Sequence, residues 1–516
     1  MCKKPILLLV LFPLLWVGCK KNNDVKSPAL EISDNDISIA HTAGRAEVTL
    51  RWAYSEWELH SAEEGFLSDF TFRHGGSLTH ASTTRIQFNY AENTTGEERQ
   101  QQLVFRNRTT GEEYPVAVNQ LPKPPVELAV NTSLKHQYIT GFGGMLNPTW
   151  TGDVQLNEAD IDFLYGSENM GLNMIRMMIY PNPDDWNKDV EVALMANAAG
   201  ARIFASPWTP PAYMKSNNNQ TGGHLLPEYY QDYVDHLNAY IEHMASKGIE
   251  VDAVSIQNEP DIDVSYDGCE WTVDEMHMFI RDYADQINAR VIAAESFNHK
   301  FTYTDVILED PVAKDNLEII GGHLYGDRSI IRDYPLAHSS GKEVWMTEYL
   351  MNDEADNYGM GWDQALEFGR VVHLSMQADF NAFVWWYMKR SYSFIGDGEL
   401  GTTDGEPLKR GYVMGHYAKY TAERQRIEVE SIAGNSDLLI TAYEGEHDVT
   451  LVIQHHGTED LQAIQFNLPI EVSSAEAIET TEADNMNAKS IALTADNTGV
   501  VLNIEPKSII SIKLIK

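Results

Sequence analysis

The stretch AVSIQNEP, residues 253–260, decides the fold. Its apolar first part predicts a short buried strand. The strand is followed directly by the polar residues Asn258 and Glu259 and then by Pro260. A buried strand that delivers a carboxylate at its end is the unit from which the rest of the chain is interpreted.

Seven further short apolar runs repeat this pattern between residues 137 and 419. They are residues 137–144, 174–179, 202–206, 290–294, 319–323, 344–347 and 382–386. Helical periodicity separates them: in residues 228–247 the apolar side chains fall on one face, and Gly248 stands at the expected C-cap. Eight strands in βα alternation predict a (β/α)8 barrel, the TIM-barrel fold, over residues 137–419.

Two of the predicted strands end in glutamate, Glu259 on the fourth and Glu348 on the seventh. The C-terminal ends of barrel strands carry the functional groups, and strands four and seven lie across the barrel mouth. Retaining glycoside hydrolysis needs two carboxyl groups about 5–5.5 Å apart. Most glutamates are solvated surface groups, but two at these positions predict a catalytic pair. Asn258 is expected to hydrogen-bond a sugar 2-hydroxyl beside the reacting carbon.

Several motifs resemble glycoside hydrolase family 30 in that family's order. They are residues 141–145 (GFGGM), 205–211 (ASPWTPP), 214–215 (MK), 255–261 (SIQNEPD), 322–326 (GHLYG), 345–348 (WMTE) and 409–412 (KRGY). The resemblance runs from about residue 141 to the end of the chain. It implies acid/base Glu259, with a raised pKa, and nucleophile Glu348. It also implies a side β-domain, a sandwich fused to the barrel and formed by residues 126–136 and 420–516.

Further site residues follow from the resemblance. Trp208 would lie beside the cleaved sugar, and Trp150 would form a further wall. Arg176 would hydrogen-bond the nucleophile region and keep Glu348 ionised. His323 and Tyr325 end the sixth strand near the same centre. Packing roles stay open for both tryptophans and for His323 and Tyr325.

Residues 384–392, VWWYMKRSY, are similar to the strand 8 loop of the family's glucuronoxylan-specific branch. There an arginine and a tyrosine bind the glucuronate side group of xylan, here Arg390 and Tyr392. A guanidinium, supported by Lys389, suits a carboxylate in a protein that is otherwise acidic. Trp386 in the same segment is also expected to bind substrate. The alternative is a structural or solvated Lys-Arg pair.

One departure from that branch concerns the residues after the nucleophile. The branch has a histidine, a tyrosine and then a serine that helps to bind glucuronate, whereas this chain has Tyr349, Leu350 and, further on, Asp353. Leu350 donates no side-chain hydrogen bond, and Asp353 would repel a carboxylate. Glucuronate dependence is therefore expected to be weaker than the strand 8 loop alone implies.

The region before the barrel has a different pattern. Short alternating runs with Gly and Asn turns over residues 29–122 predict an immunoglobulin-like β-sandwich. It resembles a BACON domain of Bacteroidetes-type lipoproteins, a spacer or a sugar-binding module. The proline-rich residues 121–125 predict a stiff linker.

The N-terminus predicts export. A basic start and the apolar residues 6–17 indicate a signal peptide over residues 1–18, although Trp16 departs from the usual leucine. Cys19 would carry lipid, and residues 19–28 would form a tether to the outer membrane. The alternative is a short anchor that is never cleaved. The unpaired Cys269 is expected to be structural.

The remaining predictions concern partners and alternatives. A net charge of −38 argues against electrostatic binding of nucleic acid. The sequence contains no His/Asp/Glu cluster with the spacing of metal ligands and no phosphate-binding loop, so we expect no metal and no organic cofactor. The leading hypothesis is a retaining endo-β-1,4-xylanase guided by (methyl)glucuronic acid branches of glucuronoxylan. The alternatives are a branch-independent xylanase, another family 30 β-glycanase, or a non-catalytic glycan-binding lipoprotein.

Overall fold

The computed structural model describes residues 26–62, 65–146, 155–326, 328–351 and 361–516. The chain divides into two compact units, and the boundary between them in the sequence lies between Pro124 and Pro125. The predicted signal peptide and Cys19 lie outside the described residues, as does most of the tether, so export and lipid attachment stay predictions. No helix within the described ranges is long and apolar enough to cross a membrane.

The N-terminal unit is a seven-stranded sheet in the order β2-β7-β6-β3-β5-β4, with β1 paired to β3. Its strands are β1 (Ala29–Ile32), β2 (Asp36–Ile39), β3 (Gly44–Ala62), β4 (Leu67–Ser68), β5 (His74–Tyr90), β6 (Arg99–Asn107) and β7 (Glu113–Gln120). Burial alternates along β6 and β7, as a sheet with one buried face requires. Trp57, Phe88 and Phe105 are fully buried in its core. The structure confirms that this region is built of β-strands, whereas the predicted immunoglobulin-like sandwich and its resemblance to a BACON domain stay predictions.

The second unit contains a closed barrel of eight parallel strands. They are β9 (Gly141–Met145), β10 (Met174–Ile179), β11 (Arg202–Pro207), β12 (Val251–Ser255), β13 (Arg290–Ser296), β14 (Ile319–His323), β15 (Glu343–Glu348) and β16 (Ala382–Trp385). Each is buried along nearly all of its length, because side chains fill the barrel on one face and helices cover the other. Phe204 and Trp345 meet edge to face at 5.5 Å inside the barrel. The predicted (β/α)8 barrel is confirmed.

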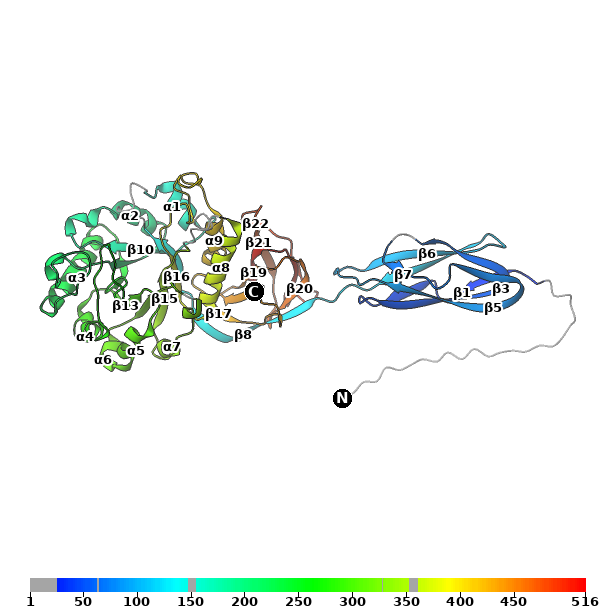
Figure 1. Ribbon diagram of the computed structural model, residues 1–516, viewed down its shortest axis with the longest axis horizontal. Coiled ribbons are helices and arrows are strands. Elements are labelled where there is room, and N and C mark those ends of the chain that lie inside the picture. Colours follow the sequence, from blue (N-terminus) through cyan, green and yellow to red (C-terminus); the bar gives the residue numbers. More distant parts are fainter. Residues whose placement is uncertain (1–25, 63–64, 147–154, 327, 352–360) are drawn as a thin grey trace. The chain divides into compact units, whose positions relative to one another are not determined.

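Helices surround the barrel (Figure 1). They are α1 (Glu158–Tyr165), α2 (Val190–Ala198), α3 (Tyr230–Ser246), α4 (Val273–Tyr283), α5 (Phe301–Glu309), α6 (Pro311–Asp315), α7 (Pro335–Ser339), α8 (Trp362–Gln377) and α9 (Lys409–Thr421). The predicted helix at 228–247 is α3, and Gly248 follows its cap residue with a φ of +84°. A glycine is suited to that left-handed position because it has no Cβ.

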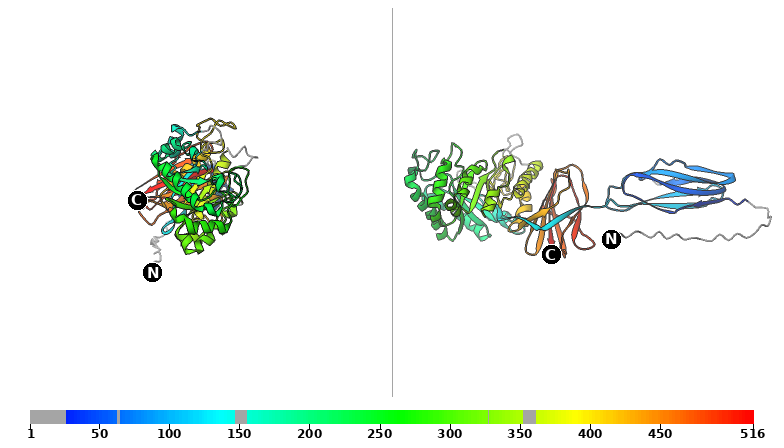
Figure 2. Two further views of the ribbon diagram at one scale, coloured as in Figure 1. Left: turned by 90° about the vertical axis from the view of Figure 1, so that its left-hand side faces the viewer. Right: turned by 90° about the horizontal axis from the view of Figure 1, so that it is seen from below.

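The side β-domain is a ten-stranded sheet in the order β22-β21-β25-β19-β18-β17-β8-β20-β24-β23. Its strands are β8 (Val126–Tyr138), β17 (Gln425–Val429), β18 (Leu438–Glu444), β19 (Asp448–His455), β20 (Leu461–Asn467), β21 (Ser474–Thr480), β22 (Asn487–Ala488), β23 (Ala492–Leu493), β24 (Gly499–Ile504) and β25 (Ser508–Ile515). Figure 2 shows β8, in cyan, crossing this domain toward the barrel. Its first residues pair with β20 and its later residues with β17.

Helices α8 and α9 join the barrel to the side β-domain. His416 on α9 lies 2.9 Å from the Ser511 hydroxyl and 2.8 Å from the Thr480 hydroxyl. Gln454 on β19 donates to the Gly369 carbonyl of α8 at 2.7 Å. The side β-domain therefore shares a layer of helices with the barrel.

Two predicted strand boundaries are wrong. Gln137 and Tyr138 belong to β8, and the first barrel strand starts only at Gly141, because the Gln137 amide is held by the carbonyls of Met376 and Phe380 outside the barrel wall. The fourth strand ends at Ser255, so Glu259 lies beyond it rather than at its end.

Candidate active site

The carboxyl ends of the barrel strands open into a cavity of about 630 Å³. That volume is in the range of small-molecule binding sites. Aromatic side chains form much of its wall, and Glu259 and Glu348 are part of it. The lining residues are Trp208, Thr221, Glu259, Ser265, Tyr266, Asp267, Phe297, Tyr325, Glu348, Leu350, Trp386 and Tyr387.

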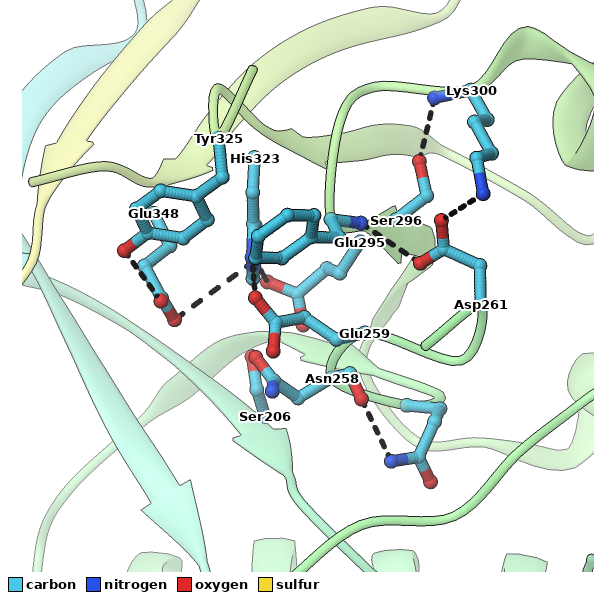
Figure 3. Close-up of polar contacts among 12 residues, drawn as sticks. Ser206, Asn258, Glu259, Asp261, Glu295, Ser296, Lys300, His323, Tyr325 and Glu348 are labelled. Carbon is cyan, nitrogen blue, oxygen red and sulfur yellow. Dashed lines mark hydrogen bonds and ion pairs between the residues drawn. The ribbon is translucent and has the colours of Figure 1, made fainter. Parts of the chain in front are cut away.

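Glu259 and Glu348 approach each other across this cavity, with His323 between them (Figure 3). One oxygen of each carboxylate lies within 4.8 Å of the other. Glu348 is the last residue of β15, whereas Glu259 is positioned by its own backbone, with a φ of +48° and an N–H that donates to the Glu295 carbonyl at 3.0 Å. Each glutamate is 6% exposed. The two carboxylates therefore reach the cavity from opposite sides while remaining largely shielded from water.

Arg176 on β10 is fully buried and connects four polar groups. Its Nη1 donates to Glu348 at 2.5 Å, and its Nη2 donates to the Asn258 side-chain oxygen at 2.7 Å. Nη2 also lies 3.1 Å from Glu295, and Nε donates to the Ser206 hydroxyl at 3.2 Å. Because the Asn258 oxygen accepts from Arg176, the amide nitrogen is the group that Asn258 can offer to a ligand.

The two carboxylates also accept hydrogen bonds from neighbouring rings. His323 Nδ1 lies 2.9 Å from Glu259 Oε1, and the Tyr266 hydroxyl donates to Glu259 Oε2 at 2.9 Å. The Tyr325 hydroxyl donates to Glu348 Oε1 at 2.8 Å. Each carboxylate thus has a polar partner at both oxygens, which fixes its orientation.

The charges in this cluster are strongly coupled. Burial raises the pKa of Glu348, against the effect of His323 and Arg176. Burial would raise the pKa of Glu259 too, but the hydrogen bond and charge of His323 lower it below its ordinary value. Burial would lower the pKa of His323, but Glu348, Glu259 and Glu295 together raise it to about 9. The pKa is thus raised at Glu348 and lowered at Glu259, which is the reverse of the prediction, because His323 lies against Glu259.

Two tryptophans line the cavity beside the carboxylates. The rings of Trp208 and Trp386 are 6.0 Å apart and tilted by 46°. The Arg176 guanidinium lies 4.7 Å from the centre of the Trp208 ring. Flat apolar rings with polar edges suit sugar binding. Trp150, the other predicted wall, lies outside the described residues.

Comparison with known proteins assigns the chain to a family. The family described as "Glycosyl hydrolase family 30 TIM-barrel domain" matches residues 184–384. The glucuronoxylanase XynC of Bacillus subtilis (strain 168) is 36% identical over 334 residues, which cover 63% of this chain and 77% of that protein. The chain belongs to glycoside hydrolase family 30.

Solved structures agree with this assignment. The family 30 subfamily 8 xylanase Xyn30A of Clostridium acetobutylicum matches with a TM-score of 0.68 at 30% identity, covering 76% of this chain and 100% of that one. A family 30 endoxylanase from Clostridium papyrosolvens C71 matches with a TM-score of 0.66 at 30% identity over the same shares. The prediction that the chain is a glycoside hydrolase is confirmed.

The strand 8 loop of this family 30 chain departs from the prediction in part. Lys389 is buried, and its Nζ lies 2.7 Å from Asp160 and 3.0 Å from Asp404. The predicted support of a bound glucuronate by Lys389 is therefore wrong, because these two carboxylates already hold the ammonium.

Arg390 and Tyr392 lie near the cavity without being among its described lining residues. The Arg390 Nε is 3.5 Å from Asp397, and its guanidinium lies 6.0 Å from the ring of Tyr387, which does line the cavity. Tyr392 is partly buried and hydrogen-bonded to Arg390. The predicted pair is thus brought together, at the margin of the site.

Sequence reasoning missed two polar residues of the family 30 site. Glu295 follows a buried apolar run just as Glu348 does, so the same signal could have identified it. Tyr266 lies in the segment between β12 and α4, and no pattern in the sequence marks it. Ser206, which precedes the last residue of β11, belongs to a motif of the sequence but carries no prediction of its own.

Within the described ranges there are two clusters of possible metal ligands, and in each cluster three side chains have ligand atoms within 4.8 Å of one another. They are Glu259, His323 and Glu348, and Asp333, His338 and Asp379. In the first group Arg176 already donates to Glu348, and in the second Arg426 donates to Asp379 at 2.5 Å. Each group therefore has a resident guanidinium, whose charge would oppose binding of a metal cation.

Replacing Arg176 with methionine is expected to lower the free energy of unfolding by about 3–5 kcal/mol. The substitution leaves the buried carboxylates of Glu348 and Glu295 without their shared guanidinium. Urea unfolding would measure the loss. Arg202→Met, which breaks a partly exposed ion pair with Asp252 at 3.2 Å, is the matched control and should cost no more than about 1 kcal/mol. Equal losses in the two variants would contradict the structural role of Arg176.

Proposed function

We propose that this family 30 enzyme is a retaining endo-β-1,4-xylanase in which Glu348 is the nucleophile and Glu259 the acid/base. The observation that carries the proposal is the approach of the two carboxylates, whose nearest oxygens lie within 4.8 Å. Retaining enzymes hold their carboxyl groups about 5–5.5 Å apart, and inverting enzymes about 6.5–9.5 Å, to leave room for water. The short separation supports a covalent intermediate.

The reaction then has two steps at one carbon. Glu348 attacks the anomeric carbon, the glycosidic bond breaks, and Glu259 protonates the leaving oxygen. Glu259 next removes a proton from water, whose oxygen attacks the same carbon and releases Glu348. The hydrogen bonds from Arg176 and Tyr325 suit Glu348 to its role, because they orient the carboxylate and stabilise its charge in the free enzyme.

His323 is suited to supply the proton that Glu259 passes on. Its pKa of about 9 keeps the imidazole protonated at neutral pH, and Nδ1 lies 2.9 Å from Glu259. Three carboxylates and two cations share the cluster, so the proton belongs to the group rather than to one residue. Once Glu348 is esterified, its charge no longer favours the imidazolium of His323.

The polymer is proposed from the relatives and the aromatic cavity. XynC and Xyn30A are a glucuronoxylanase and a xylanase by name, and both cover large parts of this chain. Trp208 and Trp386 offer ring faces, and the Asn258 amide nitrogen offers a donor for the 2-hydroxyl. These groups suit a chain of pyranose rings.

We further propose that Arg390 and Tyr392 bind a glucuronate branch. A guanidinium beside a phenol suits a carboxylate. Two observations favour the alternative, a branch-independent xylanase: Asp397 lies 3.5 Å from Arg390, and Leu350, which donates no side-chain hydrogen bond, lines the cavity.

Arg390→Ala is expected to lower kcat/KM on glucuronoxylan about 10–100-fold, because a hydrogen bond to a charged group contributes about 1.5–3 kcal/mol. The rate on unsubstituted xylan should stay unchanged. Reducing-end release by the purified enzyme from the two polymers measures both.

Arg281→Ala, which removes a half-exposed arginine from α4, is the control and should affect neither polymer. If wild type cleaves both polymers equally and Arg390→Ala changes neither rate, the branch-independent reading holds instead.

A further inference from the structure

We propose that Glu295 is a positioning residue: its buried carboxylate holds Arg176 and His323 in place and charged, and through them it sets the charge state of both catalytic glutamates. The inference rests on the proposed retaining mechanism. Glu295 is not among the residues that line the cavity, so it acts on the reaction without touching the substrate.

The side chain of Glu295 touches the partner of each catalytic glutamate. It is fully buried, and its Oε1 lies 3.1 Å from Arg176 Nη2 and 3.9 Å from His323 Nε2. Arg176 in turn donates a hydrogen bond to Glu348, and His323 is hydrogen-bonded to Glu259. Figure 3 shows Glu295 behind His323, on the side away from Tyr325. One carboxylate therefore links the two halves of the site.

The backbone of Glu295 also supports Glu259. Its carbonyl accepts the Glu259 N–H at 3.0 Å, and both residues have a φ of +48°. This left-handed conformation is uncommon for residues with a side chain, and such strain is found where the surroundings fix it for function. Gly321 on the neighbouring strand leaves room for the side chain, since a Cβ there would lie 2.9 Å from Glu295 Cγ.

Arg176 and His323 are the cations that stabilise the charge of Glu295. From β12, the uncharged hydroxyl of Ser255 is a neighbour of the Glu295 carboxylate. Near the end of β13, burial lowers the pKa of His299 to about 3, so this histidine is neutral. Lys300 is directed to Asp261, 2.8 Å away.

Glu295 itself is ionised in this setting. Burial would raise its pKa, but Arg176 and His323 lower it to about 2. The nearest like charges are Glu259 and Glu348, each separated from it by His323 or Arg176. Neutralising Glu295 removes one negative charge from the cluster. That change favours ionised Glu348 and Glu259, and it makes His323 easier to deprotonate.

The test is the pH profile of kcat/KM on xylan for full-length Glu295→Gln beside wild type. The acid limb reports the ionised nucleophile and the alkaline limb the protonated acid. Both limbs are expected to move to lower pH, by about one unit. At the optimum kcat should fall more than KM changes, since Glu295 does not touch substrate. A lower rate with both limbs unmoved, or limbs moved to higher pH, would overturn the role.

Asp261→Asn is the matched control. Asp261 is also a buried carboxylate of this region and binds Lys300 and the Phe297 N–H, but it contacts neither Arg176 nor His323 in the structure. It should lower stability without moving either limb. A shift equal to that of Glu295→Gln would show that any buried charge change here has this effect, and would overturn the assignment to Glu295.

A second measurement does not depend on the variant folding. In ¹⁵N-histidine-labelled wild type, the His323 signal should remain that of an imidazolium up to about pH 8, and a neutral ring at pH 7 would overturn the inference. This titration also separates the two proposals. Wild type without xylan hydrolysis would refute the proposed function, while the His323 signal still shows whether the histidine beside Glu295 is charged, as the inference requires.

Discussion

Glu348→Ala is expected to lower kcat on xylan about 10⁴-fold or more, the scale of loss seen when a covalent nucleophile is removed. Without the carboxylate no glycosyl-enzyme forms, and the Arg176 and Tyr325 donors then face an empty space. Reducing-end release measures the loss. Added azide should restore part of the activity and yield the α-glycosyl azide, because the small anion occupies the place of the side chain and attacks from that face.

The matched control for this variant is Glu343→Gln. Glu343 begins the strand that Glu348 ends, and it contacts Arg290 and Trp345 at the opposite end of the barrel. The Glu343→Gln variant should be less stable than wild type but should hydrolyse xylan at a rate of the same order of magnitude. Activity in Glu348→Ala without azide, at the level of this control, would refute the assignment of the nucleophile.

Glu259→Ala should lower the rate on xylan about 10²–10⁴-fold, the usual contribution of general acid–base catalysis. The loss should depend on the leaving group, which distinguishes this variant from Glu348→Ala. The dinitrophenolate of a dinitrophenyl β-xylobioside departs without protonation. The first step on this substrate should therefore remain fast, and the glycosyl-enzyme should accumulate. A burst of dinitrophenolate followed by a slow phase is the expected trace.

Azide tests the same residue from the second step. It needs no general base, so it should speed the slow phase of Glu259→Ala and give the β-glycosyl azide. Equal loss on xylan and on the dinitrophenyl substrate, with no burst, would contradict the acid/base role. An α-azide product from this variant would instead exchange the two assignments.

The barrel and the position of Glu348 could be predicted because both depend on local pattern. A buried strand needs an apolar run, and the residue after it reaches the barrel mouth. Glu259 was identified by the same rule, yet it lies beyond Ser255 and is positioned by its left-handed backbone and the Glu295 carbonyl. The chemistry was therefore predictable, and the way this residue is held was not.

Other parts of the site depend on contacts that sequence order does not reveal. Lys389 was expected at the substrate, but the structure pairs it with Asp160, which is distant in the chain. The proton was expected on Glu259, and the structure lowers the pKa of that residue because His323 from another strand lies against it. Both errors arise from partners brought together only by folding.

The most direct test of the central claim is the anomeric configuration of the first product. Proton NMR of xylo-oligosaccharide hydrolysis should show the β-anomer at the new reducing end first, with the α-anomer growing in later by mutarotation. That result is expected if Glu348 and Glu259, with oxygens within 4.8 Å, act through a covalent intermediate. Initial formation of the α-anomer would mean a single displacement by water and would contradict the account.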